Sequence, residues 1–129
     1  MTIRQEIDPG WTWDDRFSYS QAVKLGNWVY VSGQLSLDPQ GNVVGKGDLL
    51  AQSRQVFQNI EAILGTVGGT REQIVRITAY LTDMTRFSEY NRARAEFFQK
   101  NRPASTSIQV SGLAIEGLLV EVDAVAYVE

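Results

Sequence analysis

The 129-residue chain contains neither cysteine nor histidine. Without cysteine it has no disulfide, no thiolate nucleophile and no zinc site with cysteine ligands. Without histidine it lacks the commonest general base and metal ligand. A metal site would need carboxylates alone, and no carboxylate cluster has suitable spacing. If the protein is an enzyme, a carboxylate, a tyrosine, backbone amides and bound water must perform the chemistry.

Long apolar runs and clusters of basic residues are also missing. No apolar stretch approaches the about 18 residues of a membrane span, and residues 1–6 lack the apolar core of a signal peptide. We therefore expect a cytoplasmic protein with no membrane partner. The net charge of −3 and the 12 scattered Lys and Arg residues argue against nucleic acid as a partner. With 43% hydrophobic residues, the chain is expected to form one domain over residues 1–129.

The most informative segment is the extended stretch at residues 119–128. Because side chains alternate along a strand, one face of this stretch is entirely apolar. The other face combines apolar and acidic side chains, namely Leu119, Glu121, Asp123, Val125 and Tyr127. A solvent face would not carry Leu, Val and Tyr, and a core face would not carry two carboxylates. We expect another subunit to cover this face, with the carboxylates in or beside a cleft.

The remaining pattern predicts alternating strands and helices. Residues 1–17 are expected to form an irregular arm with Trp11 and Trp13 as anchors. Strands are expected at 19–25, 28–35, 74–81, 105–111 and 119–128, and helices from Asp48 to about residue 67 and from Asp83 or Thr85 to Pro103. Two amphipathic helices can cover one face of a mixed sheet. The other face is too apolar to remain in water, which predicts a symmetric oligomer with ligand sites between subunits.

Four ordered blocks in this arrangement carry a family resemblance: YSQAV at 19–23, VYVSGQ at 29–34, LTDM at 81–84 and VEVDAVA at 120–126. Over residues 18–127 the chain resembles the Rid family, the reactive intermediate deaminases of YjgF or L-PSP type. The resemblance implies an α+β, chorismate-mutase-like fold, with two helices on one face of a mixed sheet. It also implies a homotrimer with a central barrel and intersubunit clefts. Typical members hydrolyse small enamines and imines, such as 2-aminoacrylate, to a 2-keto acid and ammonia without a cofactor.

One departure from the family affects the substrate. Deaminating members carry Pro-Ala-Arg-Ser where this chain has Pro103-Ala104-Ser105-Thr106. The family arginine pairs with the substrate carboxylate through two parallel, charge-assisted hydrogen bonds. Loss of such a partner from a buried site costs about 2–5 kcal/mol. We therefore expect little activity on 2-iminopropionate. Residues 105–107 either bind a neutral polar group or are ordinary strand residues.

The resemblance also assigns roles to single residues. Glu121 matches a cleft glutamate that orients or activates the attacking water, and the alternative is a charge paired with an arginine across an interface. Asp123 is expected to be structural. The expected substrate-binding residues are Tyr19, Ser32, Gly33, Gln34, Asn91, Ser105, Thr106 and Ser107. Tyr19 can equally be a core aromatic, residues 32–34 a bulge, and Asn91 a solvated helix residue.

Three functions fit these residues. The leading hypothesis is a Rid-like hydrolase in which Glu121 assists the attack of water on a small imine, enamine or related nitrogen compound. The alternative is a non-catalytic protein that binds or senses a small metabolite in the same clefts. A ribonuclease, an activity ascribed to some relatives, is disfavoured by the pI of about 5.0 and the lack of a basic stripe.

Overall fold

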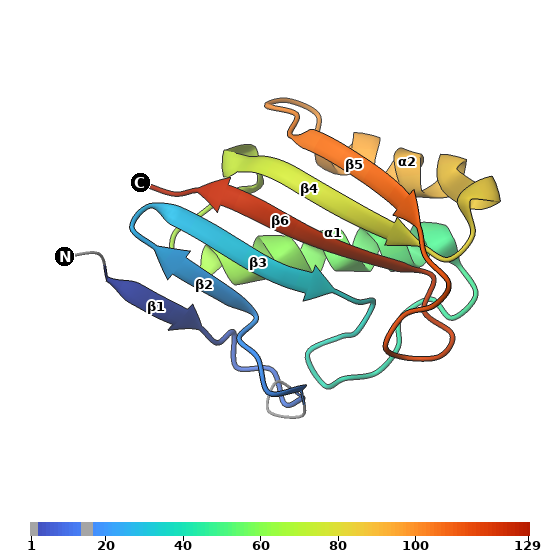
Figure 1. Ribbon diagram of the computed structural model, residues 1–129, viewed down its shortest axis with the longest axis horizontal. Coiled ribbons are helices and arrows are strands. Elements are labelled where there is room, and N and C mark those ends of the chain that lie inside the picture. Colours follow the sequence, from blue (N-terminus) through green and yellow to red (C-terminus); the bar gives the residue numbers. More distant parts are fainter. Residues whose placement is uncertain (1–2, 14–16) are drawn as a thin grey trace.

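A computed structural model of the chain describes residues 3–13 and 17–129. Two helices pack on one face of a six-stranded sheet with the order β1-β2-β3-β6-β4-β5 (Figure 1). The strands are β1 (Arg4–Ile7), β2 (Ala22–Leu25), β3 (Trp28–Gln34), β4 (Ile74–Leu81), β5 (Ala104–Gln109) and β6 (Val120–Tyr127), and the helices are α1 (Leu49–Gly65) and α2 (Phe87–Phe97). The predicted α+β class, with two helices on one face of a mixed sheet, is confirmed.

The mixed character of the sheet comes from a single crossover. Strand β6 lies in the centre and pairs antiparallel with β3 and β4. Strand β5 is parallel to β4 because α2 connects the two strands, as a parallel pair requires. Most of the apolar core lies between the sheet and the helices. A smaller cluster of Trp13, Leu35, Leu37 and Leu118 packs beside it.

The alternation predicted for the final strand is present in the structure. Val120, Val122, Ala124 and Ala126 are at most 2% exposed and point toward the helices. Their neighbours Glu121, Asp123 and Val125 are half-buried on the opposite face. The sequence period of two therefore separates the core side of β6 from the side that carries the carboxylates.

Local hydrogen bonds define where the helical segments begin. The backbone N–H of Ala51 donates to Asp48 Oδ1 over 3.0 Å, so Asp48 is the N-cap of α1, as predicted. Asp83 caps a short 3-10 turn, Met84–Arg86, by accepting from the backbone N–H of Thr85. This turn precedes α2, whose own N-cap is Arg86.

The irregular arm predicted over residues 1–17 contains a strand. Residues 4–7 form β1, which pairs antiparallel with β2, while residues 1–2 and 14–16 lie outside the described residues. Only Ile7 of this strand is buried. The pattern did not reveal β1 because an edge strand is held by backbone hydrogen bonds, and its exposed side chains need not alternate. Trp13 donates its indole N–H to the carbonyl of Asp38, which agrees with its expected anchoring role.

Alternation along residues 74–81 predicts an apolar face of Val75, Ile77, Ala79 and Leu81, and this prediction is wrong at one position. Ile77, Ala79 and Leu81 are buried as expected, but Val75 is 44% exposed and Ile74 is buried in its place. The register with β6 shifts between Ile74 and Arg76. An extra residue in one strand reverses the direction of the side chains that precede it, which accounts for the exchange.

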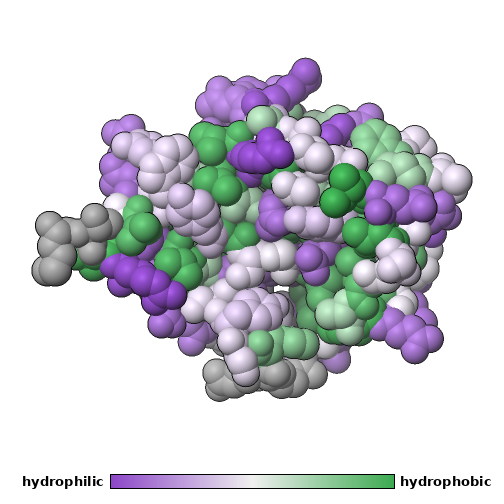
Figure 2. Space-filling model, viewed as in Figure 1, coloured by the Kyte–Doolittle hydropathy of each residue, from purple (hydrophilic) through white to green (hydrophobic). Residues whose placement is uncertain are grey.

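The sheet face opposite the helices carries many apolar and aromatic side chains. Exposed residues with side chains on this face include Leu25, Trp28, Tyr30, Ile108 and Tyr127. The rings of Trp28 and Tyr127 meet edge to face, 4.9 Å apart. Figure 2 shows this open face, where apolar and aromatic groups lie among polar ones. In the part of the chain that the structure describes, no helix has the length and apolar character needed to cross a bilayer.

The amide of Gln52 holds the segment before β6 in place. This fully buried side chain donates to the carbonyls of Gly45 and Gly117 and accepts from the backbone N–H of Leu119. It therefore links α1 to the loop at Gly45 and to the loop that leads into β6. A buried backbone group without a hydrogen-bond partner lowers stability, and the Gln52 amide supplies the partner in both loops.

We expect Gln52→Leu to lower the free energy of unfolding by about 2–4 kcal/mol, because it leaves backbone groups of both loops without a partner. Urea denaturation measures this change. Gln58→Leu, on an exposed position of the same helix, is the matched control and should change stability by less than about 0.5 kcal/mol. Equal effects of the two substitutions would contradict the role given to Gln52.

Candidate functional site

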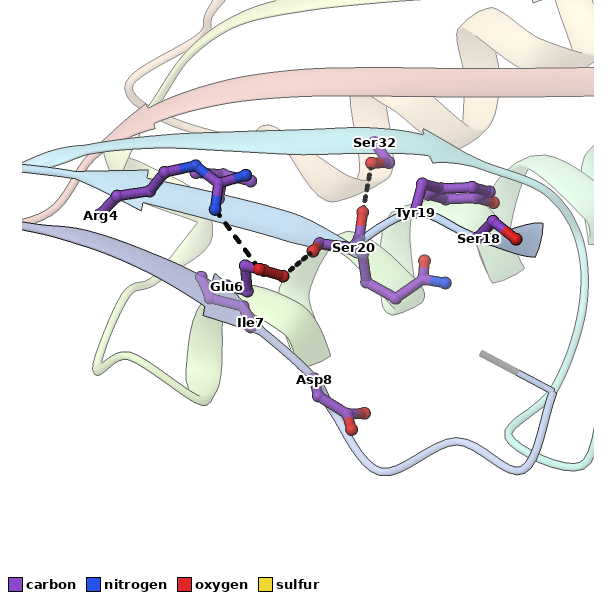
Figure 3. Close-up of a pocket in the computed structure, with 10 residues that line it drawn as sticks. Arg4, Glu6, Ile7, Asp8, Ser18, Tyr19, Ser20 and Ser32 are labelled. Carbon is purple, nitrogen blue, oxygen red and sulfur yellow. Dashed lines mark hydrogen bonds and ion pairs between the residues drawn. The ribbon is translucent and has the colours of Figure 1, made fainter. Parts of the chain in front are cut away.

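A pocket of about 680 Å³ lies between β1 and the segment that leads into β2. Its polar groups form a chain of contacts, shown in Figure 3. Glu6 accepts from Arg4 over 3.4 Å and from the Ser20 hydroxyl over 3.2 Å, and Ser32 donates to the Ser20 carbonyl over 2.6 Å. Among the described residues, the lining consists of Arg4, Glu6, Ile7, Asp8, Ser18, Tyr19, Ser20, Gln21, Val23 and Ser32. The pocket thus contains two predicted site residues, Tyr19 and Ser32.

Glu121 lies against the backbone of β3 at Gly33, which follows the pocket residue Ser32 in the chain. A Cβ atom placed on Gly33 would be only 2.5 Å from Glu121 Oε2 and 2.7 Å from its Cδ. Only a residue without a side chain allows this approach. Gly33 is also where the pairing of β3 with β6 becomes irregular, between Val31 and Gln34. The structure therefore brings together Ser32, Gly33 and Glu121, three of the predicted site residues.

The carboxylate of Glu121 has no counter-charge among the described residues. It is half-buried and forms no hydrogen bond or ion pair with them. Burial raises the pKa of the Glu121 carboxyl above its ordinary value, and the charge of Asp123 raises it further. Asp123 itself accepts a hydrogen bond from Tyr80 Oη over 3.0 Å, so it has the structural partner expected of it. A carboxylate with a raised pKa is suited to accept and return a proton.

Gln34 does not face the pocket. Its side chain is 1% exposed, and its amide donates to Gln21 Oε1 over 2.8 Å and to the carbonyl of Ser32 over 3.1 Å. Gln34 supports the wall that carries Ser32 and Gly33. Its own Oε1 has no hydrogen-bond partner among the described residues.

The three polar residues at positions 105–107 do not share one pocket. Successive side chains of β5 point to opposite faces of the sheet, so Thr106 lies on the open face and Ser105 and Ser107 lie toward α2. Thr106 accepts a hydrogen bond from Arg76 Nη2 over 2.8 Å. Ser105 accepts one from Arg94 Nη1, also over 2.8 Å. Residues 105–107 therefore lie on two faces of the sheet within one copy of the chain.

Asn91 is exposed on α2 and belongs to the Ser105 group. Its Oδ1 accepts from Arg94 Nη2 over 2.8 Å, so one guanidinium joins Asn91 to Ser105. Strand β4 separates this group from the one formed by Tyr19, Ser32, Gly33 and Glu121. Within one copy of the chain, the predicted site residues thus form two groups on different parts of the sheet.

Comparison with known proteins agrees with this architecture. A family model described as Endoribonuclease L-PSP matches residues 14–128. The chain belongs to the L-PSP family. A RutC family protein of Pyrococcus horikoshii is 40% identical over 111 residues, 86% of this chain and 87% of the relative. The 3-aminoacrylate deaminase RutC of Acinetobacter baylyi is 39% identical over 110 residues, 85% of this chain and 86% of the relative.

Solved structures of L-PSP proteins share the fold. The crystal structure of RidA from the Antarctic bacterium Psychrobacter superposes with a TM-score of 0.87 and 35% sequence identity, covering 96% of this chain and 99% of that one. The predicted membership of the Rid or L-PSP-type family and the predicted fold class are both confirmed. RutC from Acinetobacter baylyi shows that the family includes an enzyme that deaminates a small enamine.

Sequence reasoning missed several residues of this L-PSP protein that lie in the two groups. Arg4 and Glu6 were assigned to an irregular arm, so their place in the pocket wall was not predicted. Arg94 follows Asn91 by three positions on α2, which places the two side chains on one helix face. That spacing was visible in the sequence and links Arg94 to Asn91, whereas its contact with Ser105 depends on how α2 packs against β5.

The contact between Gly33 and Glu121 leads to a structural prediction. In Gly33→Ala, the new Cβ should displace the flexible Glu121 side chain while the fold remains intact. We expect the displaced carboxylate to be better hydrated, so its pKa should fall toward the ordinary value. NMR titration of the Glu121 carboxyl carbon measures this. Gly112→Ala, where an added Cβ meets no atom within 4 Å, should leave the titration unchanged. An unaltered pKa in Gly33→Ala would rule out the close contact.

The raised pKa of Glu121 also predicts how stability depends on pH. The folded state favours the protonated form of the Glu121 carboxyl. The stability that the protonated carboxyl contributes is fully present below the pKa that Glu121 has in the unfolded chain, and it is lost as pH rises through the folded-state pKa. Glu121→Gln should therefore match the wild type near pH 4 and become more stable than the wild type as pH rises toward neutrality. Urea denaturation between pH 4 and pH 8 tests this. The control is Glu116→Gln at an exposed position, which should show no such divergence.

Proposed function

We propose that this protein hydrolyses a small imine, enamine or related nitrogen compound, and that Glu121 activates the attacking water. One observation carries the proposal: a half-buried carboxylate that has no counter-charge among the described residues and lies against the backbone of Gly33, whose chain neighbour Ser32 lines the pocket. Such a desolvated charge lowers stability, and it is tolerated mainly where chemistry needs it. The 39% identity to a 3-aminoacrylate deaminase supports the same reaction class.

The proposed reaction needs only water and one proton-transfer group. The Glu121 carboxylate accepts a proton from water while the water oxygen bonds to the imine carbon. The electron pair of the C=N bond moves to nitrogen, which takes the proton from Glu121 and gives a neutral carbinolamine. Glu121 then accepts the hydroxyl proton of the carbinolamine and passes it to nitrogen as the carbonyl group forms and the C–N bond breaks. The products are a carbonyl compound and ammonia, and the carboxylate is restored.

We further propose that the complete site forms between copies of the chain in a homotrimer of single Rid-like domains. Two observations support this assembly. The open face of the sheet exposes Trp28, Tyr30 and Tyr127, a surface that would be unusual on a monomer. In addition, Glu121 and Ser105 lie on either side of β4 within one copy. In a symmetric oligomer, the residues around Ser105 of one subunit can lie beside Glu121 of its neighbour.

The substrate contacts follow from the two groups. Tyr19 and Ser32 line the pocket beside Glu121, and Asn91, Ser105 and Ser107 belong to the opposite wall. Ser105 carries no charge, so a carboxylate bonded directly to the imine carbon, as in 2-iminopropionate, meets no cation on β5 itself. We expect slower turnover of 2-iminopropionate than in relatives with arginine at this position. Thr106 is engaged by Arg76 on the open face and is the weakest of the proposed contacts.

The uncharged Ser105 also favours a second function. A cleft that lacks the family arginine can bind a small metabolite without converting it. A ligand that raises the melting temperature of the protein without being consumed would identify such a binding protein.

Glu121→Ala is expected to reduce ammonia release from small imines and enamines by at least 100-fold, because it removes the group that activates water. Coupled detection of ammonia measures turnover, and light scattering measures the mass of the assembly. The control is Glu116→Ala at an exposed position. Full turnover in Glu121→Ala with an unchanged mass would refute the proposed role of the carboxylate.

A further inference from the structure

The strands carry few charges on the open face of the sheet. Cross-strand partners lie on the same face, so the strand pairing identifies these charges. Among the described strand residues, the cations on this face are Arg4 and Arg76, and the carboxylates are Glu6, Glu121 and Asp123. Arg4 pairs with Glu6 over 3.4 Å within one copy. The other three charges form no ion pair with a described residue.

Arg76 is the cation that one copy of the chain leaves without a counter-charge on this face. Its Nη2 donates to the neutral Thr106 hydroxyl over 2.8 Å, and the side chain is exposed in a single copy. Arg94 also contacts neutral oxygens, but one of them belongs to Ser105, on the helix side of β5. If another copy covers the open face, Arg76 loses its water. A charge that is removed from water without a partner destabilises an interface, so we expect the covering copy to supply an anion.

Of the three carboxylates on the open face, Asp123 suits this role best. Glu6 is already engaged by an arginine and a serine of its own copy. Glu121 lies against the backbone of Gly33 and is the group to which the chemistry is assigned. Asp123 accepts only from the neutral Tyr80 hydroxyl, over 3.0 Å, and this bond raises the pKa of Tyr80, so the hydroxyl stays protonated. A carboxylate has about four acceptor positions, so Asp123 keeps its charge and room for a guanidinium.

We infer that Arg76 of one copy forms an ion pair with Asp123 of the next copy across their open faces, and that this contact fixes how the copies are oriented. The inference rests on the proposed assembly and names one of its contacts. Within one copy the two side chains turn to different partners, Thr106 on β5 and Tyr80 on β4. In a closed ring of identical copies the same two patches meet at every interface, so each copy gives one cation and receives one. Opposite charges also disfavour orientations that bring like charges together.

Charge reversal tests this contact. Arg76→Glu brings a second carboxylate to Asp123 of the next copy, and Asp123→Arg brings a second guanidinium to Arg76. Each change should raise the protein concentration at which the assembly dissociates by about 10-fold or more. Sedimentation velocity over a dilution series measures this, at a urea concentration that leaves the chain folded by circular dichroism. The double variant Arg76→Glu/Asp123→Arg should recover most of the wild-type value. Its bond from Tyr80 to Asp123 stays lost, so the recovery reports the ion pair alone.

Mixing the two single variants shows whether the pair joins different copies. In a mixed assembly, the Arg76→Glu copy offers its carboxylate to the new arginine of the Asp123→Arg copy, and Arg76 of the latter meets Asp123 of the former. The mixture should therefore assemble at lower concentration than either variant alone. A pair within one chain would remain broken in both variants, and mixing would change nothing. Arg92→Glu, which reverses an exposed charge on α2, is the control for net charge and should leave dissociation unchanged.

Three results would overturn the inference: single reversals that leave dissociation unchanged, a double variant as weak as the single ones, and no gain on mixing. Rescue of Arg76→Glu by Glu121→Arg instead of Asp123→Arg would also overturn it, because Glu121 would then be the partner. A wild-type trimer that both reversals leave intact rejects this contact alone, whereas a wild type with the mass of one chain rejects the assembly as well. Ammonia release from imines and enamines, measured on the wild type, decides the hydrolase separately from these masses.

Discussion

The pairing of β6 with both β3 and β4 is the constraint on which the site depends. Because β6 is central, its apolar side chains must face the helices, and its remaining side chains must face the open side of the sheet. Glu121 cannot leave that face without a shift of the whole strand, which would expose Val120 and Val122. The core therefore fixes the direction of the carboxylate, and Gly33 on the neighbouring strand gives it room.

Charge is distributed unevenly over the molecule. The surface ion pairs, such as Arg54 with Glu96, are exposed and contribute little to stability. Three charges near the proposed site residues, Glu121, Arg76 and Arg94, have no such partner among the described residues. Both arginines donate to neutral oxygens.

Patterns with one buried face were predictable from the sequence. The period of two in β6 and the cap at Asp48 gave correct elements, because burial and capping leave a local signature. Strand β1 left no such signature, since only Ile7 is buried. At Val75 a bulge turns the side chain to the open face, whereas strict alternation would place it in the core. The same limit applies to the site. Motif resemblance indicated Glu121 and Ser105, but the contacts of Arg94 depend on how α2 lies against β5, which no local pattern encodes.

The central position of β6 has a consequence for biosynthesis. This strand follows the other five in sequence, yet it separates β3 from β4, which do not pair with each other. Until residues 120–127 leave the ribosome, the strands already made can pair at most into two partial sheets, β1–β3 and β4–β5, because β6 is the strand that joins them. Neither half can be completed by the residues already made. The complete sheet therefore forms late, and a chain stalled on the ribosome before β6 would expose the unpaired edges of β3 and β4 to chaperones.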